Sequence, residues 1–320
     1  MLRFGYQAPK RAKQPFTDGI SRFFCWPAMI RLPTLSTTSQ HPLRWQFDEA
    51  PSTPAGYFSE EFDHYQLEGR VLPIAGGEKE IPQTLVIHGA RSDYIRLNAL
   101  LYPLQALGIA SLSFNLSGHS TAANVALENT SLENNLKESL RFADGLGTHL
   151  HTVIGHSMGG ALALKVAEAH RSSVKNIVLC CPALYSDDAY NPPFGTPFRK
   201  AISVPFNFLE SSSLKFLRKF EGKLMLIIGQ HDGLKSSTFG GVPGTAAGNV
   251  ITSDDQLAVR KVNSAIPYEV IKAIENNLTP HQFKKIVLPR CDHGVLAWLR
   301  DYPLVASNLA STIAKFVTQR

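Results

Sequence analysis

Short apolar runs alternate along the chain with longer segments in which apolar residues recur every three or four positions. Runs of four to eight apolar residues are typical of buried parallel strands. The longer segments indicate helices with one buried face. We expect strands within 61–73, 83–89, 109–115, 151–155, 174–184, 222–229 and 283–293. We expect helices over 96–108, 130–147, 159–170, 268–277 and 302–317.

This regular alternation of strand and helix predicts an α/β fold, with a mostly parallel sheet covered by helices on both faces. The regularity starts near residue 57, so we expect a domain over 48–320 and an N-terminal arm over 1–47. Irregular sequence rich in Pro or Gly interrupts the pattern near 186–221 and 233–281. Loops of this length usually have a function, and we expect small cap or insertion segments there.

The N-terminus of the helix expected over 130–147 carries a capping signal. Thr130 and Glu133 have the spacing of a capping box, in which each side chain accepts from the other residue's backbone N–H. The sequence therefore predicts that Thr130 caps this helix.

The formal net charge of +6 is confined to the arm. Residues 1–47 contain seven basic residues and one acidic residue, whereas the rest of the chain contains 25 of each. The body therefore lacks the basic excess that nucleic-acid binding needs, and we expect no nucleic-acid partner. The arm has two interpretations: an organelle transit peptide, or a partly ordered arm or mis-assigned start. Its apolar patch at 22–30 could dock on the domain or on a membrane surface.

The four cysteines have neither zinc-ligand spacing nor an obvious disulfide pairing. They are Cys25, Cys180, Cys181 and Cys291. This pattern favours reduced thiols in the cytoplasm, with organelle targeting through the arm as the alternative. We expect no metal and no cofactor. No apolar run approaches the roughly 20 residues of a membrane span, so no transmembrane segment is expected. The sequence leaves the oligomeric state open.

The segment GHSMGG (155–160) matches G-x-S-x-G, the motif that holds a nucleophilic serine on a sharp turn from strand to helix. A predicted strand leads into it, and a helix of small residues leaves it. Glycines two positions before and after the serine are required, because side chains there would collide across the turn. The motif predicts Ser157 as the nucleophile, and the alternative is a structural turn of Gly and Ser.

A serine nucleophile needs a general base within hydrogen-bond reach. His293 lies between the last predicted strand and the C-terminal helix, and we expect it to be that base. The alternative is a loop histidine that caps a helix. His156 adjoins the serine, and the turn should direct its side chain away. His88 ends an earlier strand and is interpreted as structural.

A base of this kind needs a carboxylate that fixes its tautomer. Asp232 follows the strand expected over 222–229, so its loop should point toward His293. The order Ser, Asp, His along the chain is the order typical of α/β folds with a nucleophile of this kind. Asp254 and Asp255 are rivals within the second insertion. Asp292 is too close in sequence to reach around its neighbour.

Acyl transfer also needs two amide donors for the oxygen of the tetrahedral intermediate. The backbone N–H of Met158, directly after the nucleophile, should be one donor. Ala90, in the loop after the strand 83–89, should be the other, with Arg91 beside it. An ordinary strand-end turn at this loop is the alternative.

Five segments in this order resemble the α/β-hydrolase superfamily. They are VIHGARSDY (86–94), SFNLSGHS (113–120), VIGHSMGG (153–160), GQHDGL (229–234) and CDHGVL (291–296). The resemblance covers about 57–320 and is strongest to the serine-hydrolase and esterase branch, with monoacylglycerol-lipase-like and serine-aminopeptidase-like members. The chain departs from that branch at Asn115 and Ser117, which replace the usual acid and Arg. The 60 residues between Asp232 and His293 are about twice the usual spacing.

Together these features predict a serine hydrolase that cleaves a carboxylic ester or thioester of a small acyl substrate through an acyl-enzyme. Peptidase and acyltransferase activities remain open on the same three residues. A catalytically silent binding protein is the alternative from another class. That alternative predicts a missing catalytic residue, and the sequence lacks none.

Overall fold

The computed structural model describes residues 36, 51–77, 80–120, 123–233, 247–252 and 258–319, with the backbone alone for 247–252 and 258–261. The arm expected over 1–47 therefore lies outside the described residues, apart from Ser36. This residue pairs with Tyr57 through two backbone hydrogen bonds of 2.6 and 2.7 Å.

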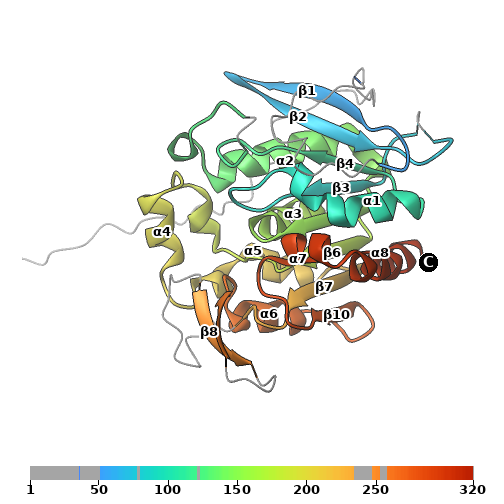
Figure 1. Cartoon of the computed structure of the whole chain (residues 1–320). Coiled ribbons are helices and arrows are strands. Elements are labelled where there is room, and N and C mark those ends of the chain that lie inside the picture. The colour runs from blue at the N-terminus through green and yellow to red at the C-terminus, as the bar shows by residue number, and fades with distance from the viewer. Residues whose placement is uncertain are drawn as a thin grey trace, which may run out of the picture. The chain divides into compact units, whose positions relative to one another are not determined.

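A sheet of eight strands forms the centre of the described domain, in the order β1-β2-β4-β3-β5-β6-β7-β10 (Figure 1). The six strands from β4 to β10 in this order are parallel to one another, while β2 is antiparallel to β4 and β1 to β2. The strands are β1 (Gly56–Phe62), β2 (Tyr65–Leu72), β3 (Thr84–Ile87), β4 (Ser111–Phe114), β5 (Thr152–His156), β6 (Asn176–Cys180), β7 (Lys223–Gly229) and β10 (Phe283–Leu288). The predicted α/β class with a mostly parallel sheet is confirmed.

Helices cover both faces of this sheet, as Figure 1 shows. On one face, α1 packs against α7 and α8; on the other, α3 packs against α2 and α5, and α5 against α6. The helices are α1 (Asn98–Ala106), α2 (Leu132–Leu146), α3 (Met158–Ala169), α4 (Thr196–Ile202), α5 (Ser212–Leu217), α6 (Tyr268–Glu275), α7 (Val295–Asp301) and α8 (Pro303–Thr318). No described helix has the length and apolar character needed to cross a membrane.

The apolar runs become the inner strands because helices exclude water from both of their faces. Every residue of β3, β4 and β6 is buried. Each fully buried Leu, Ile or Val contributes about 1.5–3 kcal/mol relative to an exposed position. The centre of the sheet is therefore a rigid support for the loops at the strand ends.

Two local expectations are corrected by the structure. The single strand expected within 61–73 is the second half of a hairpin, because the chain turns at Asp63 and His64 between β1 and β2. The cap of α2 is Ser131 rather than Thr130: its hydroxyl accepts from the N–H of Asn134 at 3.2 Å. Thr130 is buried and shares a hydrogen bond of 2.9 Å with the hydroxyl of Ser117.

The two predicted insertions contain short elements of their own. Residues 186–221 form α4, α5 and the 3-10 helices η5 (Asp187–Tyr190) and η6 (Asn207–Glu210). Residues 233–281 contain the expected helix, as α6, and an antiparallel pair, β8 (Ala247–Thr252) and β9 (Ala258–Asn263). Their roles as cap segments remain a prediction.

Candidate active site

Ser157 lies on the sharp turn between β5 and α3. Its backbone has φ 53° and ψ −120°, a conformation that costs a residue with a side chain about 1–3 kcal/mol. The turn is held by hydrogen bonds from the N–H of Ser157 to the carbonyl of Cys180 (2.9 Å) and from the N–H of Ala183 to the carbonyl of Ser157 (2.8 Å). The surrounding structure therefore maintains this strained conformation.

The glycines of the motif allow the turn to close. A Cβ atom on Gly155 would lie 2.4 Å from the carbonyl oxygen of Gly159. A Cβ on Gly159 would lie 2.3 Å from the carbonyl oxygen of Ile87, in the neighbouring strand β3. Both distances fall inside atomic contact, so these positions require glycine.

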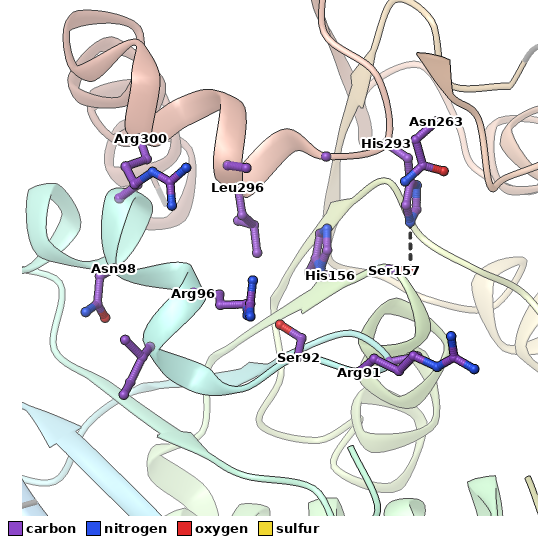
Figure 2. Close-up of a pocket in the computed structure, with 15 residues that line it drawn as sticks. Arg91, Ser92, Arg96, Asn98, His156, Ser157, Asn263, His293, Leu296 and Arg300 are labelled. Carbon is purple, nitrogen blue, oxygen red and sulfur yellow. Dashed lines mark hydrogen bonds between the residues drawn. The ribbon is translucent and has the colours of Figure 1, made fainter. Parts of the chain in front are cut away.

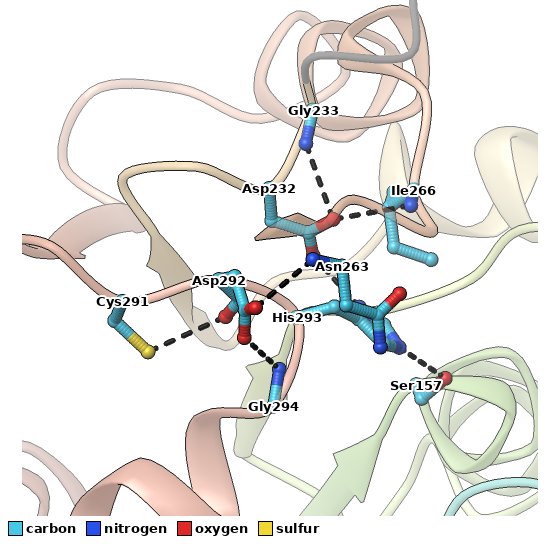
Figure 3. A network of polar contacts seen from close by, with 9 residues as sticks. All are labelled: Ser157, Asp232, Gly233, Asn263, Ile266, Cys291, Asp292, His293 and Gly294. Carbon is cyan, nitrogen blue, oxygen red and sulfur yellow. Dashed lines mark hydrogen bonds and ion pairs between the residues drawn. The ribbon is translucent and has the colours of Figure 1, made fainter. Parts of the chain in front are cut away.

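The structure brings Ser157, His293 and Asp232 into one hydrogen-bonded chain (Figure 3). The Ser157 Oγ and His293 Nε2 atoms are 3.0 Å apart. On the other side of the ring, His293 Nδ1 and Asp232 Oδ2 are 2.8 Å apart. With the proton on Nδ1 directed at the carboxylate, Nε2 is free to accept the hydroxyl proton of Ser157.

Strand order explains how residues so far apart in sequence meet. Ser157 follows β5, Asp232 follows β7 and His293 follows β10. These strands are parallel and lie within four consecutive positions of the sheet, so the loops at their carboxyl ends converge. The sheet itself therefore assembles the three groups.

Asp232 is held by more than the histidine. Its Oδ1 accepts from the backbone N–H groups of Gly233 and Ile266, each at 3.2 Å, and its side chain is 0% exposed. Its orientation toward the ring is fixed by these contacts.

The rival carboxylates have different positions. Asp292 does not contact the imidazole of His293: it accepts from the N–H of Gly294 (2.8 Å) and of Asn263 (2.9 Å) and shapes the loop. Asp254 and Asp255 lie outside the described residues. His88 is buried and bonds to Gly89 and Leu116 rather than to the serine, which agrees with a structural role.

The predicted oxyanion donors, Met158 and Ala90, lie near Ser157. Met158 is the first residue of α3, and the first N–H groups of a helix have no partner within it. Ala90 and Arg91 line the cavity that contains Ser157. The N–H of Arg91 donates to His119 Nδ1 at 3.2 Å, so that amide is already used. Of the two loop amides, Ala90 is therefore the better placed, and its role remains a prediction.

His156 does not turn away from the site as the sequence suggests. Its ring lines the same cavity as Ser157, with its centroid 5.9 Å from that of His293 (Figure 2). Burial, with a smaller contribution from His293, lowers the pKa of His156 to about 3. The ring is therefore neutral at ordinary pH and adds no charge beside the base.

The cavity has a volume of about 440 Å³, within the range of small-molecule sites. It extends from Ser157 between α7 and the segment formed by α1 and the 3-10 helix η2 (Tyr94–Leu97). Asn263, Arg96 and Arg300 line it and were not anticipated from the sequence. No motif marks them, because they meet only when these elements pack together.

One group of side chains has atoms spaced like metal ligands. Within the described residues, Cys181, Asp232 and His293 offer ligand atoms that all lie within 4.8 Å of one another. Burial and the charge of Asp232 raise the pKa of the Cys181 thiol well above its usual value. A metal here would have to displace that thiol proton and the proton between His293 and Asp232. These three side chains are therefore better suited to the hydrogen bond between His293 and Asp232 than to binding a metal ion.

Residues 81–232 match a family model described as serine aminopeptidase, S33. No protein of curated function matches the sequence. Solved structures share the fold at low identity. The ferulic-acid complex of Est1E from Butyrivibrio proteoclasticus has a TM-score of 0.57 at 16% identity, over 82% of this chain and all of that one. A thioesterase domain from the curacin biosynthetic pathway has a TM-score of 0.53 at 16% identity, over 81% and 99%. A serine hydrolase from Cycloclasticus zankles has a TM-score of 0.50 at 12% identity, over 81% and 99%.

The sheet topology and these likenesses define an α/β-hydrolase fold. The match over 81–232 makes this part of the chain similar to the family described as serine aminopeptidase, S33.

Proposed function

We propose that this protein is an esterase that hydrolyses a carboxylic ester or thioester of a small acyl substrate. Ser157 is the nucleophile, His293 the general base and Asp232 the carboxylate that orients it. The proposal rests on one observation: the continuous hydrogen-bonded chain from the serine hydroxyl through the imidazole to a fully buried carboxylate.

The reaction proceeds in two acyl transfers. Ser157 Oγ attacks the carbonyl carbon while His293 Nε2 takes its proton, and Asp232 stabilises the imidazolium that results. The imidazolium then gives its proton to the departing alcohol or thiol, which leaves the acyl group on Ser157. A water molecule, deprotonated by the same ring, releases the acid and restores the serine.

The N–H groups of Met158 and Ala90 stabilise the negative oxygen of each tetrahedral intermediate. Removing one such donor in other enzymes costs about 10²–10³-fold in turnover. The position of Met158 at the start of α3 supports this role, because the helix dipole adds a partial positive charge there.

A fluorophosphonate probe tests the nucleophile directly. We expect the wild-type protein to be labelled and to hydrolyse p-nitrophenyl esters, and Ser157→Ala to do neither. Ser120→Ala is a matched control, because this serine is buried in the loop before α2. Equal labelling of the wild type and Ser157→Ala would refute the proposal. A folded wild-type protein without labelling would favour a catalytically silent binding protein.

Peptidase and acyltransferase activities use the same three residues, and the family match names an aminopeptidase. Turnover of paired p-nitrophenyl esters and p-nitroanilides with the same acyl group separates ester from amide hydrolysis. Transfer to an added alcohol instead of water would indicate an acyltransferase. Faster cleavage of the anilide would replace the proposed esterase by a peptidase.

We also propose that the enzyme works in the cytoplasm. Cys180, Cys181 and Cys291 are buried free thiols, as expected in a reducing compartment. Fractionation of cells that express the full chain tests this, and recovery in an organelle would instead support targeting by residues 1–47.

A further inference from the structure

Two arginines lie at the end of the cavity away from the nucleophile. Arg96, in η2, and Arg300, in α7, both line the cavity. Figure 2 shows them on one side of the view, with Leu296 beside them and His156 between them and Ser157. The two elements that carry them, η2 and α7, contact each other.

The lining of the cavity is strongly unbalanced in charge. It includes three arginines, whereas no Asp or Glu of the described residues lines it. The third, Arg91, lies on the other side of Ser157, with its guanidinium directed away from Arg96 and Arg300 (Figure 2). His156 is neutral, since burial lowers its pKa to about 3. The positive charge at the far end therefore comes from Arg96 and Arg300.

Each of these two arginines has a carboxylate nearby. Arg96 Nε lies 4.0 Å from Asp93 Oδ2, while the other oxygen of Asp93 accepts from the N–H of Arg96. Arg300 Nε lies 3.5 Å from Asp301 Oδ1, and both side chains are at least half exposed. The exposed pair of Arg300 and Asp301 contributes little, because water and salt screen it, whereas the Asp93 side chain is buried. Neither carboxylate lines the cavity.

The wall between the nucleophile and the arginines is mainly apolar. Its apolar residues are Ile95 and Ala99 on η2 and α1, and Leu296 and Ala297 on α7, and the polar Ser92 and Asn98 also line the cavity. A short hydrocarbon segment fits such a wall, whereas a charge along it would lose its hydration without a partner. The cavity therefore separates a reaction centre from a basic end.

We propose that the substrate carries an anionic group, separated from the scissile carbonyl by a short apolar segment, and that Arg96 and Arg300 bind this group. The inference rests on the proposed function and narrows its substrate class. The planar guanidinium presents several N–H donors in a geometry that matches carboxylate or phosphate oxygens. Neutral esters lack this interaction and bind through the apolar wall alone.

Two pairs of test substrates distinguish whether the anionic group belongs to the acyl part or to the leaving group of the substrate. The first pair is mono-p-nitrophenyl adipate and its terminal carboxamide, which differ only in the charge at the end of the acyl chain. Adipate is chosen because the carboxylates of succinate and glutarate monoesters attack their own ester. The second pair places the charge on the leaving group: a phenyl butanoate with a propanoate side chain, and its carboxamide.

We expect wild-type kcat/KM to favour the carboxylate over the carboxamide in at least one pair, on the order of tenfold, as a charge-assisted hydrogen bond implies. Arg96→Met with Arg300→Met should bring this ratio close to one. Arg199→Met is the matched control: this exposed arginine lies on α4 and outside the cavity, so the ratio should persist. In the wild type, added salt should also reduce the ratio, a measurement that needs no variant.

Each outcome decides a different point. A wild-type ratio of one or less in both pairs, with Ser157-dependent hydrolysis of the carboxamides, overturns the inference and leaves the proposed function standing. A preference that survives the double substitution and high salt also overturns it. If neither pair is hydrolysed and the fluorophosphonate probe does not label Ser157, the proposed function fails, and this inference with it.

Discussion

Replacing Asp232 by Asn is the most informative single change, because it alters one hydrogen bond and leaves the others in place. The Oδ1 atom of Asp232 accepts two backbone N–H groups at 3.2 Å, and the same oxygen of an asparagine can keep both. The amide nitrogen must then face His293 Nδ1, where Oδ2 now lies at 2.8 Å. Because that nitrogen only donates, the ring must move its own proton to Nε2.

The expected loss in kcat follows from the change of tautomer, which removes the base. A proton on Nε2 points at Ser157 Oγ, 3.0 Å away, so the ring can no longer accept the hydroxyl proton. The same tautomer change in the chymotrypsin-type triad lowers kcat about 10⁴-fold. At about 1.4 kcal/mol for each factor of ten, this raises the barrier by roughly 5–6 kcal/mol. The stability of the fold should change much less.

The assay is kcat on a p-nitrophenyl ester, with thermal melting to confirm folding. Asp292→Asn is the control, because Asp292 neighbours His293 in sequence but accepts from the backbone N–H groups of Asn263 and Gly294. Asp254→Asn tests the rival acid. A folded Asp232→Asn enzyme that keeps more than about a tenth of its kcat, or a larger loss in Asp254→Asn, would refute the assignment, since the expected loss is about 10⁴-fold.

Four further substitutions test the fold around the site. Ser131→Ala removes the cap of α2 and should lower the free energy of unfolding by about 1 kcal/mol in urea titrations. Gly159→Ala should cost about 1–3 kcal/mol or more, because its Cβ would meet backbone atoms. Gly145→Ala, with open space around it in α2, should instead stabilise by up to about 1 kcal/mol; equal effects of the two would contradict the packing argument. Burial lowers the pKa of His119 and His156 to about 3. Below about pH 6.5 these two imidazoles therefore become protonated in the unfolded chain but stay neutral in the native state. Stability should therefore fall as pH decreases from about 6.5 toward 3, and less steeply in His119→Gln; identical pH slopes would show that His119 contributes nothing.

Much of the sheet could be predicted because its strands are apolar on both faces. The runs that become β3, β5 and β7 end in glycine or lead into a glycine-rich turn, so their bounds are clear in the sequence. The turn that carries Ser157 was predicted from the same local signal, since the motif and its strand and helix are contiguous. Ser157 and its neighbours therefore needed no knowledge of distant contacts.

Features that depend on tertiary contacts could not be predicted in this way. Thr130 fits a capping box by spacing, yet its hydroxyl is used by Ser117, and Ser131 caps the helix instead. The direction of His156 depends on how the turn packs beside His293. Arg96 and Arg300 become neighbours of the site only because η2 and α7 meet.

The buried side chain of Glu138 supports the loop at 115–120, a contact that could not be predicted from the sequence. The loop at 115–120 lacks the acid and Arg usual in similar hydrolases. Instead, Glu138 accepts from the backbone N–H of Ser117 at 3.1 Å, from Tyr65 at 2.7 Å and from Asn135 at 3.0 Å. A residue from α2 thus supports the loop, at a distance in sequence that no local motif reveals.

Because β7 and β10 are adjacent in the sheet, residues that follow them can be far apart in sequence and still lie close in space. Asp232 and His293 are 61 positions apart, yet their side chains touch because they follow neighbouring parallel strands. Doubling the length of a flexible connection adds only about 0.6 kcal/mol of closure entropy. The connection before Asn263 can therefore change in length at little entropic cost, while the N–H of Ile266 and the pairing of β7 with β10 keep Asp232 and His293 in register.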